Sequence, residues 1–451
     1  MSGDPRGASP ETYPLIRHQR RDAIFAFRGT RPITVEEYLA DVAALAERLP
    51  AHRNVLNLCA DRYRFAVGLG AALCRRQVSL MPPNDRPGLL GDLAADFPDL
   101  YCLADAPPPI STIPSLLYLE ALPGGGAAAL PALPADQPAV LLFTSGSTGR
   151  PKPSPKSWGT LVRSALSAGD RLGIAALPGA TIVGTVPHQH SYGLESTVLL
   201  GLQHGLALQA ERPLYPGDVR ACLEAARRPR LLVTTPIHIR ALMAEPDTLP
   251  QADLVISATA PLAQALAVEA EDRFRAPLLE IYGCSEAGQL ATRRTAERQE
   301  WQGLDGVALR QDNDGTWAGG SIVEAPTLLQ DFIELARDGR FLLHGRMADL
   351  VNIAGKRTSL AYLDHHLNAI PGVQDGVFVL PEGDDDHVRR LIAVVVAPNL
   401  QPETILAALR QRIDAAFLPR PLIFVPSLPR NALGKLPRDA LLQLLSQRGP
   451  G

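Results

Sequence analysis

The stretch Leu141–Trp158 reads LLFTSGSTGRPKPSPKSW, and it joins an apolar segment to a run of small polar residues. The apolar residues Ala139–Phe143 predict a buried strand. The residues that follow this strand are Thr144, Ser145, Gly146, Ser147, Thr148, Gly149, Arg150, Pro151 and Lys152. Hydroxyl groups, backbone N–H groups left accessible by glycine and a nearby cation are what a loop needs to bind a polyphosphate. The stretch therefore predicts a phosphate-binding loop, with a flexible Ser/Gly linker as the alternative.

The bulk properties narrow the class of protein. A chain of 451 residues, 46% hydrophobic and 20% charged, is long enough for two or three domains of ordinary globular composition. A formal net charge of −3 gives no reason to expect nucleic acid or an anionic membrane as a partner. The first residues lack a secretory signal, and no apolar run approaches the ~18 residues that span a bilayer. Five scattered cysteines without CxxC spacing indicate reduced thiols, no zinc site and a cytoplasmic location.

Lysine is rare in this chain. Of the 44 basic residues, only Lys152, Lys156, Lys356 and Lys435 are lysine, and all the others are arginine. A lysine that persists under such a bias is a candidate for a role that needs a compact ammonium rather than a guanidinium. All four lie in short motifs discussed below, which favours chemistry over surface decoration.

Alternating helical and strand-like segments predict an α/β fold with parallel sheets covered by helices. Predicted strands are Asn54–Ala60, Gln77–Met81, Ala139–Phe143, Thr181–Val186, Leu231–Thr235, Leu254–Ser257 and Leu278–Tyr282. Predicted helices are Val35–Leu49, Arg64–Cys74, Ala221–Arg228 and Leu262–Phe274. Residues 122–136 predict a loop, and residues 291–346 predict a small β-barrel-like subdomain. Ligands of such sheets bind at the carboxyl ends of the strands.

Three motifs carry a resemblance to one superfamily. They are the TSGSTGRPK loop, the run Tyr282-Gly283-Cys284-Ser285-Glu286 and the late run Pro429-Arg430-Asn431-Ala432-Leu433-Gly434-Lys435-Leu436-Pro437-Arg438. In this order they resemble the adenylate-forming superfamily of acyl- and aryl-CoA synthetases, peptide-synthetase adenylation domains and luciferases. The resemblance implies a large N-terminal adenylation domain, residues 1–346, and a small mobile α+β C-terminal domain, residues 347–451.

The resemblance implies roles on the nucleotide side. Residues 144–149 and Lys152 would hold the ATP phosphates. Thr259 and Ala260 lie in the adenine turn, where Ala258 and Thr259 stand in place of two glycines. The remaining nucleotide contacts would be Tyr282, Gly283, Ser285 and Asp331, the last on the ribose, although the usual Thr-Gly before Asp331 is absent. Glu286 would be the carboxylate ligand of Mg²⁺ and a catalytic residue.

The resemblance also implies the catalytic and hinge residues. Lys435 would bridge the substrate carboxylate and the α-phosphate, and Arg346 would act on the phosphate side. Asp349 would be the hinge between the domains, and Gly355 would approach the thiol in the second step. Asn352 stands where most relatives have lysine, which is a departure from the pattern.

The acid-binding residues implied by the resemblance are His190, Ser191, Gly193, Gly283 and Trp158. Position 190 lacks the aspartate of amino-acid-activating domains, so an amino acid is disfavoured. Pro153, Ser154, Lys156 and Trp158 replace the usual residues after the phosphate loop, which separates the chain from typical fatty acyl-CoA synthetases. The pattern looks more like stand-alone bacterial ligases of pigment-type secondary metabolism.

The implied function is an ATP- and Mg²⁺-dependent acid–thiol ligase. It would form an acyl-adenylate and pass the acyl group to CoA or to the phosphopantetheine of an acyl carrier protein. A hydroxylated aryl acid such as 4-hydroxybenzoate is the favoured substrate, with a medium-chain or β-hydroxy fatty acid as the alternative. A kinase or NTPase has no use for Gly434-Lys435, and a non-catalytic acyl-adenylate binder would be expected to lose Lys435 or Glu286 first.

Overall fold

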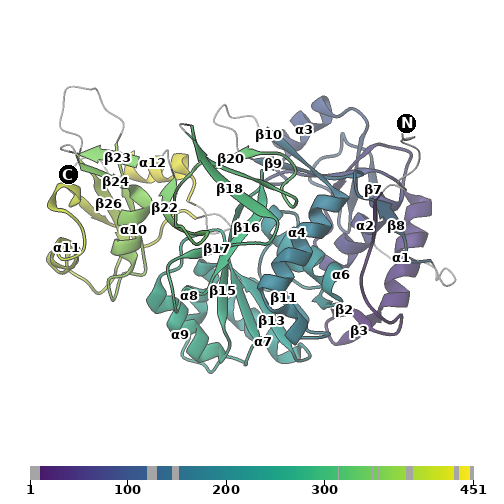
Figure 1. Ribbon diagram of the computed structural model, residues 1–451, viewed down its shortest axis with the longest axis horizontal. Coiled ribbons are helices and arrows are strands. Elements are labelled where there is room, and N and C mark those ends of the chain that lie inside the picture. The colour runs from purple at the N-terminus through teal and green to yellow at the C-terminus, as the bar shows by residue number, and fades with distance from the viewer. Residues whose placement is uncertain are drawn as a thin grey trace, which may run out of the picture.

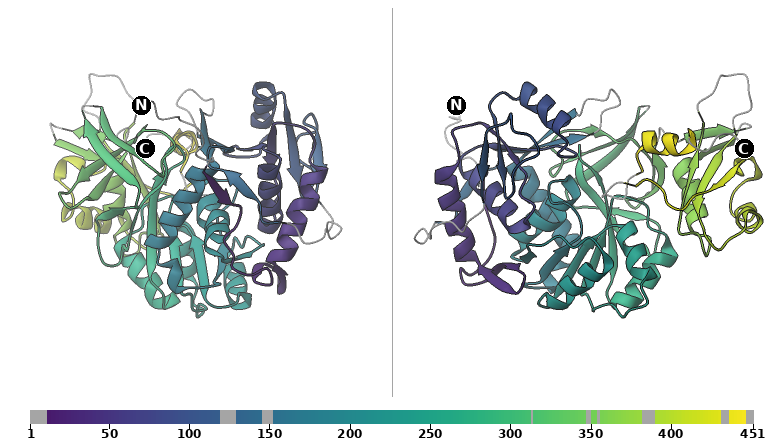
Figure 2. Two further views of the ribbon diagram at one scale, coloured as in Figure 1. Left: turned by 45° about the vertical axis from the view of Figure 1, so that its right-hand side comes forward. Right: turned by 180° about the vertical axis from the view of Figure 1, so that it is seen from behind.

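The structure is a computed structural model that describes residues 11–118, 129–144, 152–312, 314–346, 350–353, 356–381, 390–430 and 436–446. Figure 1 shows two large sheets side by side, with a smaller C-terminal unit at the left of the view. Figure 2 shows the same arrangement from two further sides, with the C-terminal unit again at one end of the molecule. The architecture is α/β, as the sequence predicts.

The first large sheet has six strands in the order β10-β9-β5-β4-β6-β7. Its strands are β4 (Asn54–Asn57), β5 (Val78–Met81), β6 (Leu100–Ala104), β7 (Ser115–Leu117), β9 (Pro138–Thr144) and β10 (Lys152–Ser157). All neighbours are parallel except β9 and β10, which form an antiparallel hairpin at one edge. Because β9 runs parallel to β5, its carboxyl end lies at the same edge of the sheet as the carboxyl ends of the other parallel strands.

The second sheet has eleven strands in the order β21-β22-β17-β16-β15-β14-β13-β11-β12-β2-β3. Its parallel centre consists of β2 (Ile24–Arg28), β11 (Thr181–Gly184), β12 (Ala207–Gln209), β13 (Arg230–Thr234), β14 (Leu254–Ser257) and β15 (Leu278–Cys284). Its antiparallel margins are β3 (Arg31–Thr34), β16 (Gly288–Arg293), β17 (Trp301–Gly303), β21 (Asp331–Leu335) and β22 (Arg340–Arg346).

Helices cover both sheets and fill the space between them. The main core contains apolar residues from α1 (Val35–Arg48), α2 (Arg62–Cys74), α4 (Trp158–Arg171) and α6 (Leu200–His204), together with residues from strands of both sheets. A second core lies on the other face of the large sheet, under α7 (Pro216–Ala225), α8 (Pro236–Ala244) and α9 (Gln264–Phe274). A third lies under α3 (Pro87–Asp96). The parallel strands are therefore buried on both faces, as is usual for sheets of this kind.

The barrel-like subdomain predicted for residues 291–346 takes the form of two open sheets. Strands β16, β17, β22 and β21 continue the large sheet, whereas β18 (Val307–Asp312), β19 (Gly315–Gly320) and β20 (Thr327–Leu328) form a separate three-stranded sheet. The apolar residues of both sheets share one core, which includes Tyr282, Trp301 and Phe341.

The C-terminal unit has its own sheet and core. Its strands are β25 (Asp375–Val379), β26 (Ile392–Val396) and β27 (Leu422–Phe424), and its helices are α10 (Leu360–Asn368), α11 (Pro402–Arg410) and α12 (Arg438–Ser446). A two-stranded hairpin, β23 (Leu350–Ile353) with β24 (Lys356–Ser359), precedes it. The large and small parts that the sequence predicts are therefore both present.

Two short strands form a further small sheet. Strand β1 (Thr12–Pro14) pairs with β8 (Ala132–Pro134), although the sequence predicts only a loop over residues 122–136. Within the described residues, no helix is both long and apolar enough to cross a membrane. The five cysteines are free thiols, as the sequence predicts.

Candidate active site

The hairpin β9–β10 positions the predicted phosphate loop. Thr144 and Lys152 are paired at the last rung of the hairpin, so residues 145–151 form the connection between the strands. Those residues, which include Ser145, Gly146, Ser147, Thr148 and Gly149, lie outside the described part of the chain, as does the side chain of Thr144. Lys152 is exposed at the start of β10. Strand β9 and Lys152 therefore flank residues 145–151 on either side.

Tyr282 and Asp331 come together, although 49 positions separate them in the chain. The Tyr282 hydroxyl donates a 2.8 Å hydrogen bond to Oδ2 of Asp331. The Tyr282 ring is held edge-on by Phe341, with a centroid distance of 5.8 Å, and tilted against Trp301 at 5.7 Å. In the register of β21 with β22, Asp331 lies opposite Arg346, whose side chain lies outside the described residues. Both predicted nucleotide contacts thus share one corner of the large sheet.

The turn after β15 presents the predicted metal ligand. Glu286 is exposed there, and Ser285 beside it is half-buried. A Cβ at Gly283 would lie 2.2 Å from the carbonyl oxygen of Gly288, so only glycine fits where β15 closes on β16. The close approach fixes the direction in which Ser285 and Glu286 leave the strand.

The adenine turn is strained at Thr259. This β-branched residue has φ +80°, a region that such residues rarely enter. Related proteins are expected to have glycine here, which enters this region without strain. Holding Thr259 in this conformation costs about 1–3 kcal/mol.

The acid-side segment, residues 187–195, follows β11 and is supported by buried groups. Arg62 is fully buried and donates to the carbonyl oxygens of Gln209 at 2.6 Å and Gly184 at 2.9 Å. Burial lowers the pKa of Arg62 to about 10. His188 is buried, contacts the carbonyl oxygen of Cys59 at 2.9 Å, and has its pKa lowered to about 3, first by burial and then by the Arg62 charge. These two groups fix the backbone that leads to the half-buried His190.

A helix with a π-helical turn carries the rest of the acid side. His190 caps a short turn, Ser191–Gly193 (α5), which continues as the π-helical segment Leu194–Leu199 (η2). Such turns are frequent at functional sites. A Cβ at Gly193 would lie 2.0 Å from the carbonyl oxygen of Pro187, so glycine is required for this tight entry. The Ser191 hydroxyl donates to Oε1 of Glu195 at 2.6 Å.

Lys156 and Glu195 form a buried charged cluster that the sequence does not reveal. Lys156 is 2% exposed, and its Nζ donates to the backbone carbonyl of Glu286 at 2.5 Å. Glu195 is 5% exposed and accepts from the backbone N–H of Gln289 at 3.2 Å. Burial lowers the pKa of Lys156 and raises that of Glu195, while each charge favours the ionised form of the other. The scarcity of lysine in this chain was the sequence signal for Lys156. The spacing of residues gave no signal for Glu195 as the charge near it.

Trp158, which the sequence predicts on the acid side, and Tyr192 of α5 are both engaged in contacts within the protein. Trp158 is fully buried at the start of α4, and its Nε1 donates to the Tyr13 carbonyl at 3.3 Å. The Tyr192 hydroxyl donates to the carbonyl oxygens of Thr234 at 3.0 Å and Ile256 at 3.1 Å, at the carboxyl ends of β13 and β14. Trp158 therefore packs in the main core, and Tyr192 ties α5 to the ends of β13 and β14.

The small part of the molecule contacts the large part near the predicted lysine loop. Arg430 donates to Asp375 through Nε at 2.7 Å and Nη2 at 2.9 Å. Arg240 of α8 lies 3.8 Å from the same carboxylate. Lys435, Asp349 and Gly355 lie outside the described residues. Asp375 thus joins α8 to the segment that leads into residues 431–435.

The predicted Mg²⁺ ligand fits the chemistry of the site. No group of three or more His, Cys, Asp or Glu side chains suited to a metal occurs among the residues that the structure covers. Mg²⁺ is usually held by one or two carboxylates together with substrate phosphates. The exposed Glu286, next to Ser285 in the turn after β15, would supply such a carboxylate.

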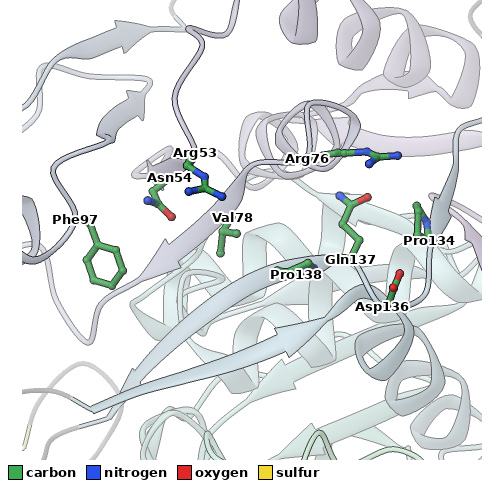
Figure 3. A pocket seen from close by; sticks show the side chains of 9 residues that line it. All are labelled: Arg53, Asn54, Arg76, Val78, Phe97, Pro134, Asp136, Gln137 and Pro138. Carbon is green, nitrogen blue, oxygen red and sulfur yellow. The ribbon is translucent and has the colours of Figure 1, made fainter.

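A separate cavity of 580 Å³ lies at the opposite edge of the six-stranded sheet. Figure 3 shows Arg53 and Asn54 on one side of it and Asp136 and Pro134 on the other. Asn54 and Pro138 are the first residues of β4 and β9, so this cavity lies at the amino ends of the strands. The predicted site lies at the carboxyl ends, and this cavity has no part in it.

Comparisons with known sequences and structures identify the family of the chain. The sequence profile of the family described as AMP-binding enzyme matches residues 93–311. The chain is 33% identical to the 4-coumarate–CoA ligase of Rhodobacter capsulatus over 301 residues, which cover 65% of this chain and 73% of the relative. It is 25% identical to the 3-hydroxybenzoate–CoA/4-hydroxybenzoate–CoA ligase of Thauera aromatica over 352 residues, 69% of this chain and 67% of the relative.

The fold comparison covers nearly the whole chain. The crystal structure of ATP-bound MatB from Rhodopseudomonas palustris matches with a TM-score of 0.81 at 19% identity, covering 96% of this chain and 98% of that one. The chain belongs to the AMP-binding, adenylate-forming enzyme family. Within it, the protein is an AMP-forming ligase of the acyl/aryl-CoA ligase family.

Proposed function

We propose that this ligase activates a hydroxylated aryl carboxylic acid such as 4-hydroxybenzoate and transfers the aryl group to a phosphopantetheine thiol. The thiol belongs to CoA or to an acyl carrier protein. The observation that carries the proposal is the arrangement at one edge of the sheets. Tyr282 is bonded to Asp331, and the backbone N–H of Gln289, just after the Glu286 turn, is bonded to Glu195 of the segment in which His190 and Ser191 offer polar groups.

In the first half-reaction the substrate carboxylate attacks the α-phosphorus of ATP, and pyrophosphate leaves. Asp331 would accept the ribose hydroxyls, with its orientation held by the Tyr282 hydroxyl. Lys152 and the loop before it would hold the β- and γ-phosphates. Glu286 would supply a carboxylate ligand to Mg²⁺, whose charge would offset the negative charge of the phosphates.

The acid and the α-phosphate are both anions, so their approach needs a positive charge. Lys435 would supply it, together with Arg346 on the phosphate side. The protein then contributes positioning and charge compensation rather than a nucleophile of its own. His190 and Ser191 are half-buried polar residues, and the hydroxyl of a hydroxylated ring can hydrogen-bond to groups of this kind.

In the second half-reaction the thiol sulfur attacks the carbonyl carbon of the acyl-adenylate, AMP leaves and the thiol proton is released. The small domain would turn about Asp349, withdraw Lys435 and bring Gly355 towards the phosphopantetheine arm. Such domain movements limit turnover in many enzymes.

The test is carboxylate-dependent pyrophosphate release from ATP·Mg²⁺. The panel contains benzoate, 3- and 4-hydroxybenzoate, cinnamates, short β-hydroxy acids and medium-chain fatty acids. We expect release with a hydroxylated aryl acid and at least tenfold less with benzoate, as loss of one buried hydrogen bond of ~1.4 kcal/mol gives. Preference for a fatty or β-hydroxy acid would overturn the substrate class, and absence of release with every acid would favour a non-catalytic binder. The active acid is then offered with CoA and with phosphopantetheinylated carrier protein to identify the acceptor.

A further inference from the structure

Lys156 occupies an unusual place for a lysine. It lies on β10, which follows the phosphate loop, and it is the buried residue of a strand whose other residues are exposed or half-buried. The strand is paired with β9 at Val140, and its register shifts directly after Lys156. The same strand begins with the exposed Lys152. The two lysines at its ends therefore have opposite environments.

The contacts of Lys156 reach across to the second sheet. Its Nζ donates to the carbonyl oxygen of Glu286, 130 positions further along the chain. That carbonyl belongs to the turn that carries Ser285 and the carboxylate of Glu286. One end of the contact is fixed to the phosphate hairpin and the other to the predicted metal-binding turn.

A second group links Lys156 to the acid side. Glu195, on the π-helical turn, is the charge that acts most strongly on Lys156. Glu195 itself is held by Ser191 and by the backbone N–H of Gln289, which follows the metal-binding turn. Lys156 contacts the turn that carries Glu286, and Glu195 contacts Ser191 and Gln289, so the two buried charges lie next to the segments predicted to face the metal and the acid.

Stability alone does not explain this arrangement. Moving a charge from water into the protein interior costs free energy. Replacing both members of a buried ion pair with well-packed apolar residues is often neutral or stabilising. Apolar side chains at both position 156 and position 195 would fill similar space without this cost. The lysine is therefore a candidate for a role in the site.

We propose that Lys156 is a positioning residue for the nucleotide half of the reaction. By holding the Glu286 carbonyl, its ammonium fixes the metal-binding turn against the phosphate hairpin, with Glu195 as its counter-charge. The inference rests on the proposed function because it assigns Glu286 to ATP·Mg²⁺. The positively charged group is needed in the free protein, before any acid binds.

The test compares Lys156→Met with the unaltered protein in two measurements that need no turnover. Calorimetry gives the Kd for ATP·Mg²⁺ at several Mg²⁺ concentrations, and thermal melting gives Tm. Removing a residue that supports a metal ligand typically weakens affinity about 10–100-fold. We expect the Kd to rise at least about tenfold, with the shift larger at low Mg²⁺. Tm should fall in Lys156→Met, because Glu195 is left as a buried carboxylate without its counter-charge, and should recover in Lys156→Met/Glu195→Gln. In pyrophosphate release, KM for ATP·Mg²⁺ should rise and KM for the acid should stay within about threefold.

Arg53→Met is the matched control because it removes one positive charge at the far edge of the six-stranded sheet. It should leave the Kd within about twofold, which separates positioning from a general change in net charge. If Lys156→Met fails to fold, the double variant Lys156→Met/Glu195→Gln takes its place, because it also replaces the carboxylate that the single variant leaves without a counter-charge. It should show the same weakened ATP·Mg²⁺ binding.

The outcomes separate the inference from the proposed function. Unchanged Kd with a lowered Tm in Lys156→Met would overturn the inference and leave a structural role. Unaltered protein that does not bind ATP·Mg²⁺ would overturn the proposed function and the inference with it. Binding by the unaltered protein without pyrophosphate release would overturn only the proposed reaction, and the comparison of Kd values would still decide the role of Lys156.

Discussion

The nucleotide side and the acid side of the site are built in different ways. On the nucleotide side, Tyr282 and Asp331 are joined by one hydrogen bond on neighbouring parts of the large sheet. On the acid side, Ser191 is bonded to a buried glutamate, Glu195, which shares a buried cluster with Lys156. The first consists of residues that the motifs predicted, whereas the second includes a buried glutamate that no motif predicted.

The difference indicates which part of the site is expected to determine the choice of substrate acid. Every member of an adenylate-forming family handles the same nucleotide, so the residues facing it are constrained in kind. The acid varies, and the segment predicted to face it is held here by the buried Glu195. Substitutions on the two sides should therefore separate the kinetic constants for ATP from those for the acid.

The largest effect is expected from Lys435→Ala. Loss of a charge-stabilising group at a reacting centre typically lowers kcat about 10²–10³-fold. We expect at least this loss in acyl-adenylate formation, measured as pyrophosphate release. Transfer from a chemically prepared acyl-adenylate to the thiol should be much less affected. Adenylation at an unchanged rate would refute the role given to this residue.

Asp331→Asn and Tyr282→Phe should act on the nucleotide side alone. Tyr282→Phe removes the hydrogen bond that orients the carboxylate, worth about 1 kcal/mol, so KM for ATP should rise about fivefold. Asp331→Asn should raise it about tenfold or more because a hydrogen bond to a charged acceptor is stronger. Steady-state kinetics with the acid saturating measures both. A rise in KM for the acid alone would contradict the assignment.

Ser191→Ala should act on the acid side alone. It removes a hydroxyl that is bonded to Glu195 at 2.6 Å and that we place near the acid. KM for the hydroxylated acid should rise about threefold to tenfold, with KM for ATP within twofold. Varying the acid at saturating ATP gives the first constant, and the reverse experiment gives the second. Equal changes in both constants would show that the two sides are not independent.

The smallest effect concerns stability rather than catalysis. Burial lowers the pKa of His188 from 6.5 to about 3 and that of His18 from 6.5 to about 4. The unfolded chain binds these protons at higher pH than the folded one, so unfolding takes up protons between about pH 6.5 and 4. The free energy of unfolding should fall as pH falls through this range, by up to about 1.4 kcal/mol per pH unit for each histidine.

His188→Gln removes one of these two groups, and Arg62 remains to hold the backbone of the acid-side segment. Urea unfolding at pH 7.5, 6.0 and 5.0 should show a smaller decrease in this variant than in the unaltered protein. The same slope in both proteins would mean that His188 carries no part of the acid sensitivity.

Local signals made much of the fold predictable. Helix α1 begins where predicted because Thr34 and Glu37 form a capping box. Strand β14 has the predicted bounds, Leu254–Ser257. Helix α7 was predicted over Ala221–Arg228 but spans Pro216–Ala225, because Pro216 favours the first position of a helix. Strand β8 was missed because its pairing partner β1 lies more than a hundred residues earlier.

The candidate site was predictable to the extent that motifs carry it. The motifs pointed to Tyr282, Asp331 and Glu286, and the structure places them at one edge. The contact of Lys156 with the Glu286 carbonyl joins two sheets, and no spacing rule relates such distant positions. Trp158 was predicted on the substrate, but its fully buried position at the start of α4 depends on packing around Tyr13 that sequence patterns do not encode.

The most direct test of the central claim is detection of the acyl-adenylate itself. The unaltered protein is mixed with ATP, Mg²⁺ and 4-hydroxybenzoate without a thiol acceptor, and the products are resolved by mass spectrometry. We predict 4-hydroxybenzoyl-adenylate and pyrophosphate in equal amounts, neither of them formed when the acid is omitted or when Lys435 is replaced by alanine. Pyrophosphate or ADP formed without the acid, or no adenylate from any acid of the panel, would contradict the account.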